Sequence, residues 1–390
     1  MQWKNKILTL LLLLSGRLVN AQTGWERKAD FPGVIRFGAV GFSINGKGYV
    51  GTGRNSSIGS FKDFWEYDPI LNSWTRKTDF PGLARVNAVG FSIGVKGYIG
   101  TGAGGTFLKD FWEYDPINNT WTQKADFGGT GRYSAVGFSI GNKGYIGTGT
   151  DGSETKDFWE YDPSNNQWTQ KANFGGSQRV TATSFTINNK AYVGAGLLGS
   201  QKNDFWEYSP LTDTWTQKAS ITGPGGWGST SFSISKTGFI KSGTGSQRDF
   251  WEYNPESNLW IQRDSFPDKF DQESVGFSIN GKGYIVTANA SNNHVWEYTP
   301  KIATSSLSVQ LCPSLHPNPF FSNATLSSSD NFTDIVFTIY NSSGQKVRQI
   351  VNITGNTLLL KKENLSSGLY FLRLTRGAKL ITTCKFIVFN

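Results

Sequence analysis

An internal repeat that occurs six times dominates the sequence and constrains its fold more than any other feature. Each copy contains a segment related to Gly41–Ile44 (Gly-Phe-Ser-Ile), a segment related to Asp63–Pro69 (Asp-Phe-Trp-Glu-Tyr-Asp-Pro) and a Trp that usually opens a Trp-Thr-x-Lys segment. The repeated tryptophans are Trp25, Trp74, Trp121, Trp168, Trp215 and Trp260, so successive copies are 45 to 49 residues apart. A period of this length is typical of propeller blades, which bury their apolar surfaces against one another.

Each repeat reads as four short strands, which we call a to d in chain order. Strand a is the Ala-Val-Gly-Phe-Ser-Ile run, and a tight turn such as Asn45-Gly46 leads from it into strand b. Strand c is the Phe-Trp-Glu-Tyr run, which ends at Asp-Pro because proline cannot donate to a strand ladder. Strand d begins at the repeated Trp. Four antiparallel strands in each of six repeats predict an all-β, six-bladed β-propeller.

The repeat resembles the kelch motif. Strand b ends in glycines such as Gly51 and Gly53, a Tyr-Asp-Pro closes strand c, and Trp74 lies seven residues after Tyr67. The resemblance covers residues 22–300 and implies a propeller of the galactose oxidase/kelch superfamily. The sequence departs from the kelch pattern because a threonine separates the paired glycines. The expected fold is unchanged, because small residues still occupy the turn.

The order of the strands predicts how the ring closes. The strand at Trp25 is a strand d with no strands a to c before it, and the last repeat ends at Trp296–Tyr298 without a strand d. We therefore expect the N-terminal strand to complete blade six, which removes free sheet edges.

The N-terminus has the pattern of a secretory signal peptide over residues 1–21. Lys4 and Lys6 precede the apolar run Ile7–Leu14, and Val19–Ala21 provides small residues for cleavage after Ala21. The run is too short to span a bilayer, which needs about 20 residues. We expect a mature chain without a transmembrane segment.

The formal charge of +9 belongs mostly to the two ends of the chain. Residues 22–305 contain 27 basic and 26 acidic side chains, whereas residues 306–390 contain 8 basic and 3 acidic ones. A nucleic-acid-binding surface needs a concentrated basic face. The large domain is balanced, so the charge argues against a nucleic-acid partner.

After the repeats the composition changes. Residues 301–311 read as a linker, and residues 312–390 contain Pro317–Pro319 (Pro-Asn-Pro), Ile339–Val347, Leu365–Tyr370 (Leu-Ser-Ser-Gly-Leu-Tyr) and a terminal apolar strand with Lys385. These elements resemble the C-terminal sorting domain of type IX secretion, a small Ig-like β-sandwich. The resemblance implies export across the periplasm and outer membrane of a Bacteroidetes bacterium by the type IX machinery, followed by surface attachment or release. The alternative is an Ig-like sandwich with no sorting role.

The chain has two cysteines, Cys312 and Cys384, and both lie in this C-terminal domain. Export permits a disulfide between its first and last strands. The alternative is two buried free thiols.

The candidate ligand-binding residues lie on the propeller face that carries the b–c and d–a loops, because the b–c loops vary most between repeats and function concentrates on such loops. Eleven residues after each strand-d Trp lie Arg36, Arg85, Arg132, Arg179, Gly226 and Asp271. They form either a partial arginine ring that recognises a carboxylate or sulfate, or structural pairs with neighbouring blades. The remaining candidates are Arg54 and Asp151 in b–c loops, and Trp227, Asp271 and Glu273 in the blades where the pattern breaks.

No catalytic constellation is evident. The chain has two histidines, His294 and His316, which excludes a multi-histidine metal centre and galactose-oxidase chemistry, and no cofactor is expected. The repeated strand-c glutamates, such as Glu66, are expected to pair with strand-d lysines such as Lys77. A carboxylate pair for carbohydrate chemistry remains open on Asp151, Asp271 or Glu273.

The sequence therefore favours a secreted or surface-bound, non-catalytic module that binds an unidentified extracellular glycan or protein. The alternatives are a carbohydrate-active enzyme, for which kelch propellers that isomerise sialic acid are the nearest analogy by fold, and a purely structural surface protein.

Overall fold

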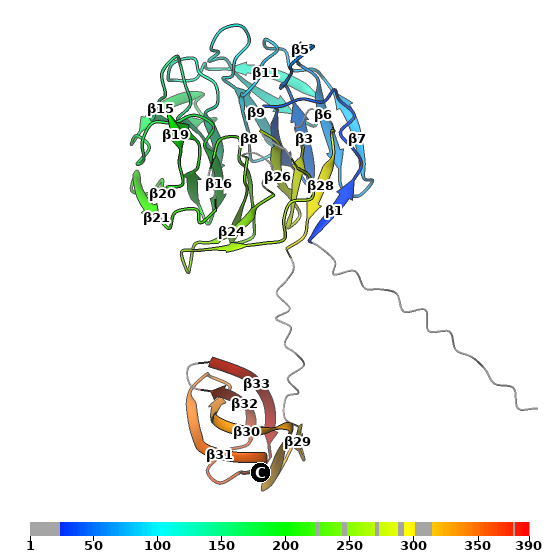
Figure 1. Cartoon of the computed structure of the whole chain (residues 1–390), viewed down its shortest axis with the longest axis vertical. Helices are drawn as coiled ribbons and strands as arrows, with labels where there is room; N and C mark the ends of the chain where they lie inside the picture. The colour runs from blue at the N-terminus through cyan, green and yellow to red at the C-terminus, as the bar shows by residue number, and fades with distance from the viewer. Residues whose placement is uncertain are drawn as a thin grey trace, which may run out of the picture. The chain divides into compact units, whose positions relative to one another are not determined.

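Six four-stranded antiparallel sheets form the N-terminal part of the chain (Figure 1). The structure is a computed structural model that describes residues 24–223, 226–243, 248–269, 273–287, 292–300, 314–376 and 379–389. The chain divides into two compact units, Met1–Pro300 and Lys301–Asn390. The expected signal peptide, the linker at 301–311, Asp271 and Cys312 lie outside the described residues.

The blades follow one another along the chain, and each has strands a to d in order. Blade one is β2 (Val40–Ile44), β3 (Lys47–Gly51), β6 (Phe64–Asp68) and β7 (Ser73–Lys77). Blade two is β8 (Val89–Ile93), β9 (Lys96–Gly100), β10 (Phe111–Asp115) and β11 (Thr120–Lys124). Blade three is β12 (Val136–Ile140), β13 (Lys143–Gly147), β14 (Phe158–Asp162) and β15 (Gln167–Lys171). Blades four and five are β16 (Thr183–Ile187), β17 (Lys190–Gly194), β20 (Phe205–Ser209) and β21 (Thr214–Lys218); and β22 (Thr230–Ile234), β23 (Thr237–Lys241), β24 (Phe250–Asn254) and β25 (Leu259–Gln262). Blade six is β26 (Val275–Ile279), β27 (Lys282–Val286), β28 (Val295–Tyr298) and β1 (Trp25–Lys28). Two b–c loops carry the short hairpins β4 (Arg54–Asn55) with β5 (Gly59–Ser60), and β18 (Leu197–Leu198) with β19 (Ser200–Gln201).

Strand a of each blade packs against strand a of the next, because its sequence alternates large apolar and very small residues. In β8, Val89, Phe91 and Ile93 are buried. Gly90 alternates with them, and a Cβ atom there would lie 2.7 Å from the Cβ of Val40 in the preceding blade. The glycine therefore permits the close approach of inner strands that forms the hub of the propeller.

A repeated aromatic cluster joins each blade to the next. In the first copy, the Phe64 ring of blade one lies 4.8 Å from the Tyr114 ring and 5.0 Å from the Trp121 ring of blade two. Edge-to-face contacts of this kind add to the energy of area burial. In the copy between blades five and six, Phe250 contacts Tyr298 at 4.7 Å and Trp25 at 4.8 Å.

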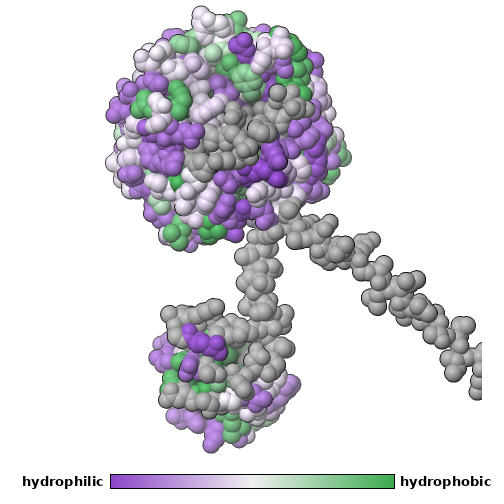
Figure 2. All heavy atoms as spheres, viewed as in Figure 1, coloured by the Kyte–Doolittle hydropathy of each residue, from purple (hydrophilic) through white to green (hydrophobic). Residues whose placement is uncertain are grey.

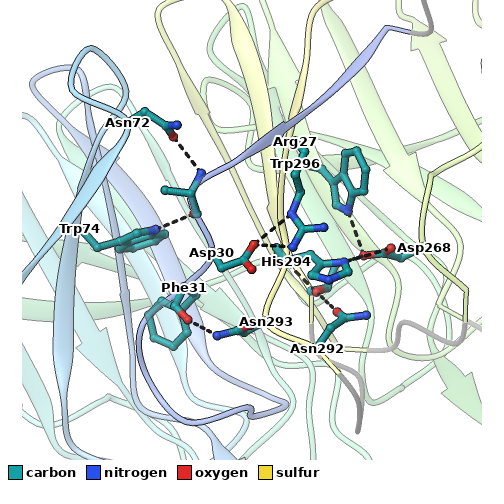
Figure 3. Close-up of polar contacts among 12 residues, drawn as sticks. Arg27, Asp30, Phe31, Asn72, Trp74, Asp268, Asn292, Asn293, His294 and Trp296 are labelled. Carbon is teal, nitrogen blue, oxygen red and sulfur yellow. Dashed lines mark hydrogen bonds and ion pairs between the residues drawn. The ribbon is translucent and has the colours of Figure 1, made fainter.

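The N-terminal strand β1 forms strand d of blade six. It pairs with β28 in the register Trp25↔Tyr298, and the Trp25 side chain is 6% exposed. Figure 3 shows the adjoining seam with blade one, where the backbone of Phe31 bonds to Asn293 and the indole of Trp74 donates to the carbonyl of Ala29 at 3.1 Å. The first segment of the chain thus bonds to both the last blade and the first.

The C-terminal unit is a five-stranded antiparallel sheet around its own core. It contains β29 (Ser314–His316), β30 (Asn323–Asn341), β31 (Lys346–Lys361), β32 (Gly368–Arg376) and β33 (Lys379–Val388) in the order β29-β30-β32-β33, with β31 paired to β30. Register shifts along β30 and β31 let these long strands bend, and Phe337, Leu372 and Phe386 lie in the enclosed core. The all-β fold class that the sequence predicts is confirmed for both units.

The described part of the chain contains no helix long and apolar enough to cross a membrane.

Candidate functional site

Four of the candidate arginines form ion pairs inside their own blades. Arg85, which is fully buried, donates from Nη1 to Asp110 Oδ1 at 2.8 Å and from Nη2 to Asp110 Oδ2 at 2.6 Å. Its Nε and Nη1 also donate to the carbonyl oxygens of Leu83 and Thr101. The equivalent pairs are Arg36–Asp63, Arg132–Asp157 and Arg179–Asp204.

Both partners of these ion pairs make further hydrogen bonds. Trp112 Nε1 donates to the same Asp110 carboxylate at 2.7 Å. Burial raises the pKa of Asp110, but the hydrogen bonds and positive charge of Arg85 outweigh it and hold the pKa below its ordinary value. Because most donors of each guanidinium are already used, the geometry favours the structural interpretation of Arg36, Arg85, Arg132 and Arg179 over ligand recognition. The partner is in the same blade rather than in a neighbouring one.

Blade six has a different pair here, with the carboxylate in the d–a loop and a histidine at the start of strand c. His294 stands where the other blades have the strand-c aspartate, and its Nδ1 lies 3.0 Å from Oδ2 of Asp268 in the d–a loop. Trp296 Nε1 donates to Asp268 at 2.8 Å, as shown in Figure 3. In blade five, Asp249 accepts from Gln262 instead, and the buried indole nitrogen of Trp251 has no partner among the described residues.

A ring of equivalent residues surrounds the central channel, two positions after the arginine position of each repeat. Its members are Gly38, Asn87, Ser134, Thr181, Gly228 and Glu273, and all have a left-handed φ between 51° and 72°. Backbone hydrogen bonds pass from blade to blade around the ring, for example from Asn87 N to Gly38 O at 2.8 Å and from Gly38 N to Glu273 O at 3.3 Å. This ring belongs to the d–a loops, so it lies on the face where we expect binding.

The ring lines the mouth of a cavity of about 130 Å³, together with the residue that follows each ring member. A deeper cavity of about 170 Å³ shares Ala39, Ala88, Ala135, Ala182, Ser229 and Ser274 with it. The two form one channel. The wall of the deeper cavity is apolar in blades one to three and carries hydroxyls in blades four to six, where Thr183 Oγ1 donates to Ser231 Oγ at 2.7 Å.

Among the described residues that line the channel, Glu273 is the only charged one. Asn87 Nδ2 donates to Glu273 Oε1 at 3.3 Å and to Ser134 Oγ at 3.1 Å, so one amide spans from blade six to blade three. The contact needs glycine at position 38, because a Cβ there would overlap Asn87 Oδ1. Burial raises the pKa of Glu273, and the bond from Asn87 offsets this only in part. Within the described ranges no lysine, arginine or histidine pairs with it.

The other candidates lie outside this channel. Arg54 is exposed on β4, and Asp151 accepts from Thr130 Oγ1 at 2.6 Å, which lowers its pKa. Trp227 is half-buried and immediately precedes Gly228. It occupies the position that Phe37 and Val86 have in earlier repeats. Asp271 lies outside the described residues. The structure therefore brings Glu273 together with Asn87, Ser134 and Thr181, which the sequence analysis did not select.

The strand-c glutamates have structural partners. Glu66 accepts from Tyr49 Oη at 2.6 Å and lies 3.5 Å from Lys77 Nζ. No group of three or more metal-ligating side chains occurs within the part of the chain that the structure describes.

Comparisons with known proteins identify the C-terminal unit and the fold of the propeller. Residues 314–389 match the family described as the secretion system C-terminal sorting domain. No curated protein matches the chain. The solved structure of YjhT is similar at a TM-score of 0.57 and 18% identity, over 69% of this chain and 95% of that one. The chain is therefore a β-propeller that carries a sorting domain for type IX secretion, which directs it to the cell surface or the surrounding medium.

Proposed function

We propose that this protein is an exported, non-catalytic binding module that holds a small polar group of its ligand, such as the terminal unit of a glycan, at the channel mouth. The observation that carries the proposal is Glu273, a half-buried carboxylate at the rim of an open cavity. A partly desolvated charge without a cationic partner among the described residues is unfavourable for the fold, and groups with a shifted pKa in a concave site mark functional positions.

The composition of the surface supports a polar ligand. Hydrophilic and hydrophobic residues alternate over the coloured part of the propeller in Figure 2, without a broad apolar patch. Large exposed apolar patches mark interfaces with proteins or membranes. The polar cavity at the hub is thus a better candidate site than the surrounding face.

The test is a glycan-array screen of the mature chain, beginning at residue 22, beside two variants. Glu273→Gln removes the charge at the channel mouth, and Glu256→Gln removes the charge of an exposed glutamate in the turn after β24. We expect the hits of the unmodified chain to survive Glu256→Gln and to weaken at least tenfold in Glu273→Gln. An array without hits, or hits that Glu273→Gln leaves unchanged, would refute a site at the channel mouth.

The second candidate function is a carbohydrate-active enzyme. The raised pKa of Glu273 favours it, because a carboxyl group with a raised pKa is better suited to act as a general acid. Asp151, however, is not among the residues that line the channel. Incubating each array hit with the chain and following its NMR spectrum distinguishes the two functions, since only an enzyme converts the ligand.

A further inference from the structure

The residues of the channel mouth also indicate what kind of chemical group enters it. Most side-chain donors there are already used. Asn87 Nδ2 donates to two protein oxygens, Thr181 Oγ1 donates to the carbonyl of Val180 at 2.8 Å, and Ser229 Oγ donates to that of Gly226 at 3.0 Å. The hydroxyl hydrogen of Ser134 remains, because that oxygen acts as an acceptor for Asn87.

Acceptors, in contrast, remain available. A carboxylate offers about four lone-pair positions, and the single bond from Asn87 occupies one of those on Glu273. The carbonyl oxygen of the Asn87 side chain can also accept. Because most side-chain donors of the channel mouth are used and its acceptors remain available, the mouth favours a ligand group that donates several hydrogen bonds.

The charge of the channel mouth also favours a ligand group that donates hydrogen bonds. The arginines nearest the ring in sequence, such as Arg36 and Arg85, are neutralised by Asp63 and Asp110. The Glu273 carboxylate has no such partner among the described residues. Because a charge in a partly desolvated site interacts more strongly than one in water, a cation at this position would gain more than a neutral hydroxyl.

The backbone conformation adds a second observation at this glutamate. Glu273 has φ = 53°, in the left-handed region that non-glycine residues avoid, as do Asn87, Ser134 and Thr181 at the equivalent positions of other repeats. A non-glycine residue is strained in this conformation. Glu273 is the member of the ring that combines such strain with a half-buried carboxylate that has no cationic partner among the described residues, and this combination is typical of functional sites, where a ligand compensates for it.

We propose that the channel mouth binds a primary ammonium group, such as that of a free amino sugar, between the Glu273 carboxylate, the Asn87 side-chain carbonyl and the Ser134 hydroxyl oxygen. This proposal rests on the proposed binding function and names the ligand class of the same site.

The experiment compares matched pairs on the array used above. Each pair presents the same sugar as the free amine and as the N-acetyl derivative, for example glucosamine and N-acetylglucosamine, at neutral pH. We expect the full mature chain to bind the amine at least tenfold more tightly than its N-acetyl partner. Glu273→Gln should abolish that preference, whereas Glu256→Gln, which makes the same charge change on an exposed turn, should preserve it.

The outcomes separate the two proposals. If the array gives hits but the N-acetyl or other neutral sugars bind as tightly as the amines, the ammonium proposal is wrong while the binding function stands. If amines bind better but Glu273→Gln keeps the preference, the attraction comes from elsewhere and the proposal is also wrong. If no glycan binds, the proposed function fails and the ammonium proposal fails with it. A melting curve for each variant checks folding, and equal binding of the amine and N-acetyl sugars by the unmodified chain would overturn the ammonium proposal without any variant.

Discussion

Replacing Arg85 by alanine tests whether the arginine series supports the fold. Arg85 is fully buried, and the change removes its two bonds to Asp110 and its bonds to the carbonyls of Leu83 and Thr101. It leaves the Asp110 carboxylate with the Trp112 indole as its side-chain donor. Removing one partner of a buried ion pair costs about 3–5 kcal/mol. In a domain of this size, that corresponds to a fall in Tm of about 6–15 °C.

Tryptophan fluorescence during thermal unfolding measures this effect on the propeller alone, because all tryptophans of the mature chain lie before residue 300. The matched control is Arg76→Ala. Arg76 pairs with Asp79 at 3.0 Å, but the two side chains are 58% and 49% exposed, so its loss should cost less than about 1 kcal/mol. Removing Asp110 as well should recover part of the stability lost in Arg85→Ala. Equal melting temperatures for Arg85→Ala and Arg76→Ala would refute a structural role for the buried pair.

Four further predictions concern the ends of the chain and the channel. Deleting residues 22–29 should lower the Tm of the propeller sharply, because the deletion removes the outer strand of blade six; an unchanged melting curve would contradict this. Because burial raises the pKa of Glu273, its replacement by glutamine should stabilise the propeller at neutral pH, and the gain should vanish as the pH falls below about 4; a gain that persists under acid conditions would oppose it. Removing residues 312–390 should trap the propeller in the periplasm, and cell fractionation that finds it outside would argue against sorting by this domain. Cys384 is disulfide-bonded, and we predict Cys312 as its partner; peptide mapping without reduction should recover the linked pair, and a free Cys312 thiol would exclude it.

The propeller could be predicted from the sequence because its constraints are local and repeated. Strand c is marked by Phe-Trp-Glu-Tyr in five blades and by Val-Trp-Glu-Tyr in blade six. The glycine of strand a recurs in four blades, where inner strands approach most closely. The position of the arginine series could also be counted along the repeat. The role of the arginine series could not be predicted, because a sequence does not show whether a guanidinium such as that of Arg85 contacts an internal carboxylate or a ligand.

The channel mouth depends on contacts between distant repeats, which no local pattern reveals. Asn87 and Glu273 are 186 residues apart and meet only because Gly38 between them has no side chain. A signal was present, since these three residues occupy the same position of their repeats, two residues after the arginine position. In blade six, His294 breaks the aspartate series, and its partner Asp268 stands eight residues after Trp260, where the other five repeats have a glycine such as Gly82. Both replacements could be counted along the repeat, whereas their contact emerges only from the fold.

The N-terminal strand of blade six also sets an order of events for the chain. Because β1 pairs with β28, this N-terminal strand can join its sheet only after nearly all of the propeller has been synthesised. Formation of such distant contacts is slow, since a long loop must be closed first. With the signal peptide that the sequence predicts, the same order leaves the propeller open while the chain crosses the inner membrane. The sorting domain follows the closing blade in the chain, so an interrupted chain that cannot complete its ring also lacks this export signal. We therefore expect truncated propellers, with their unpaired edges, to be kept from the cell surface.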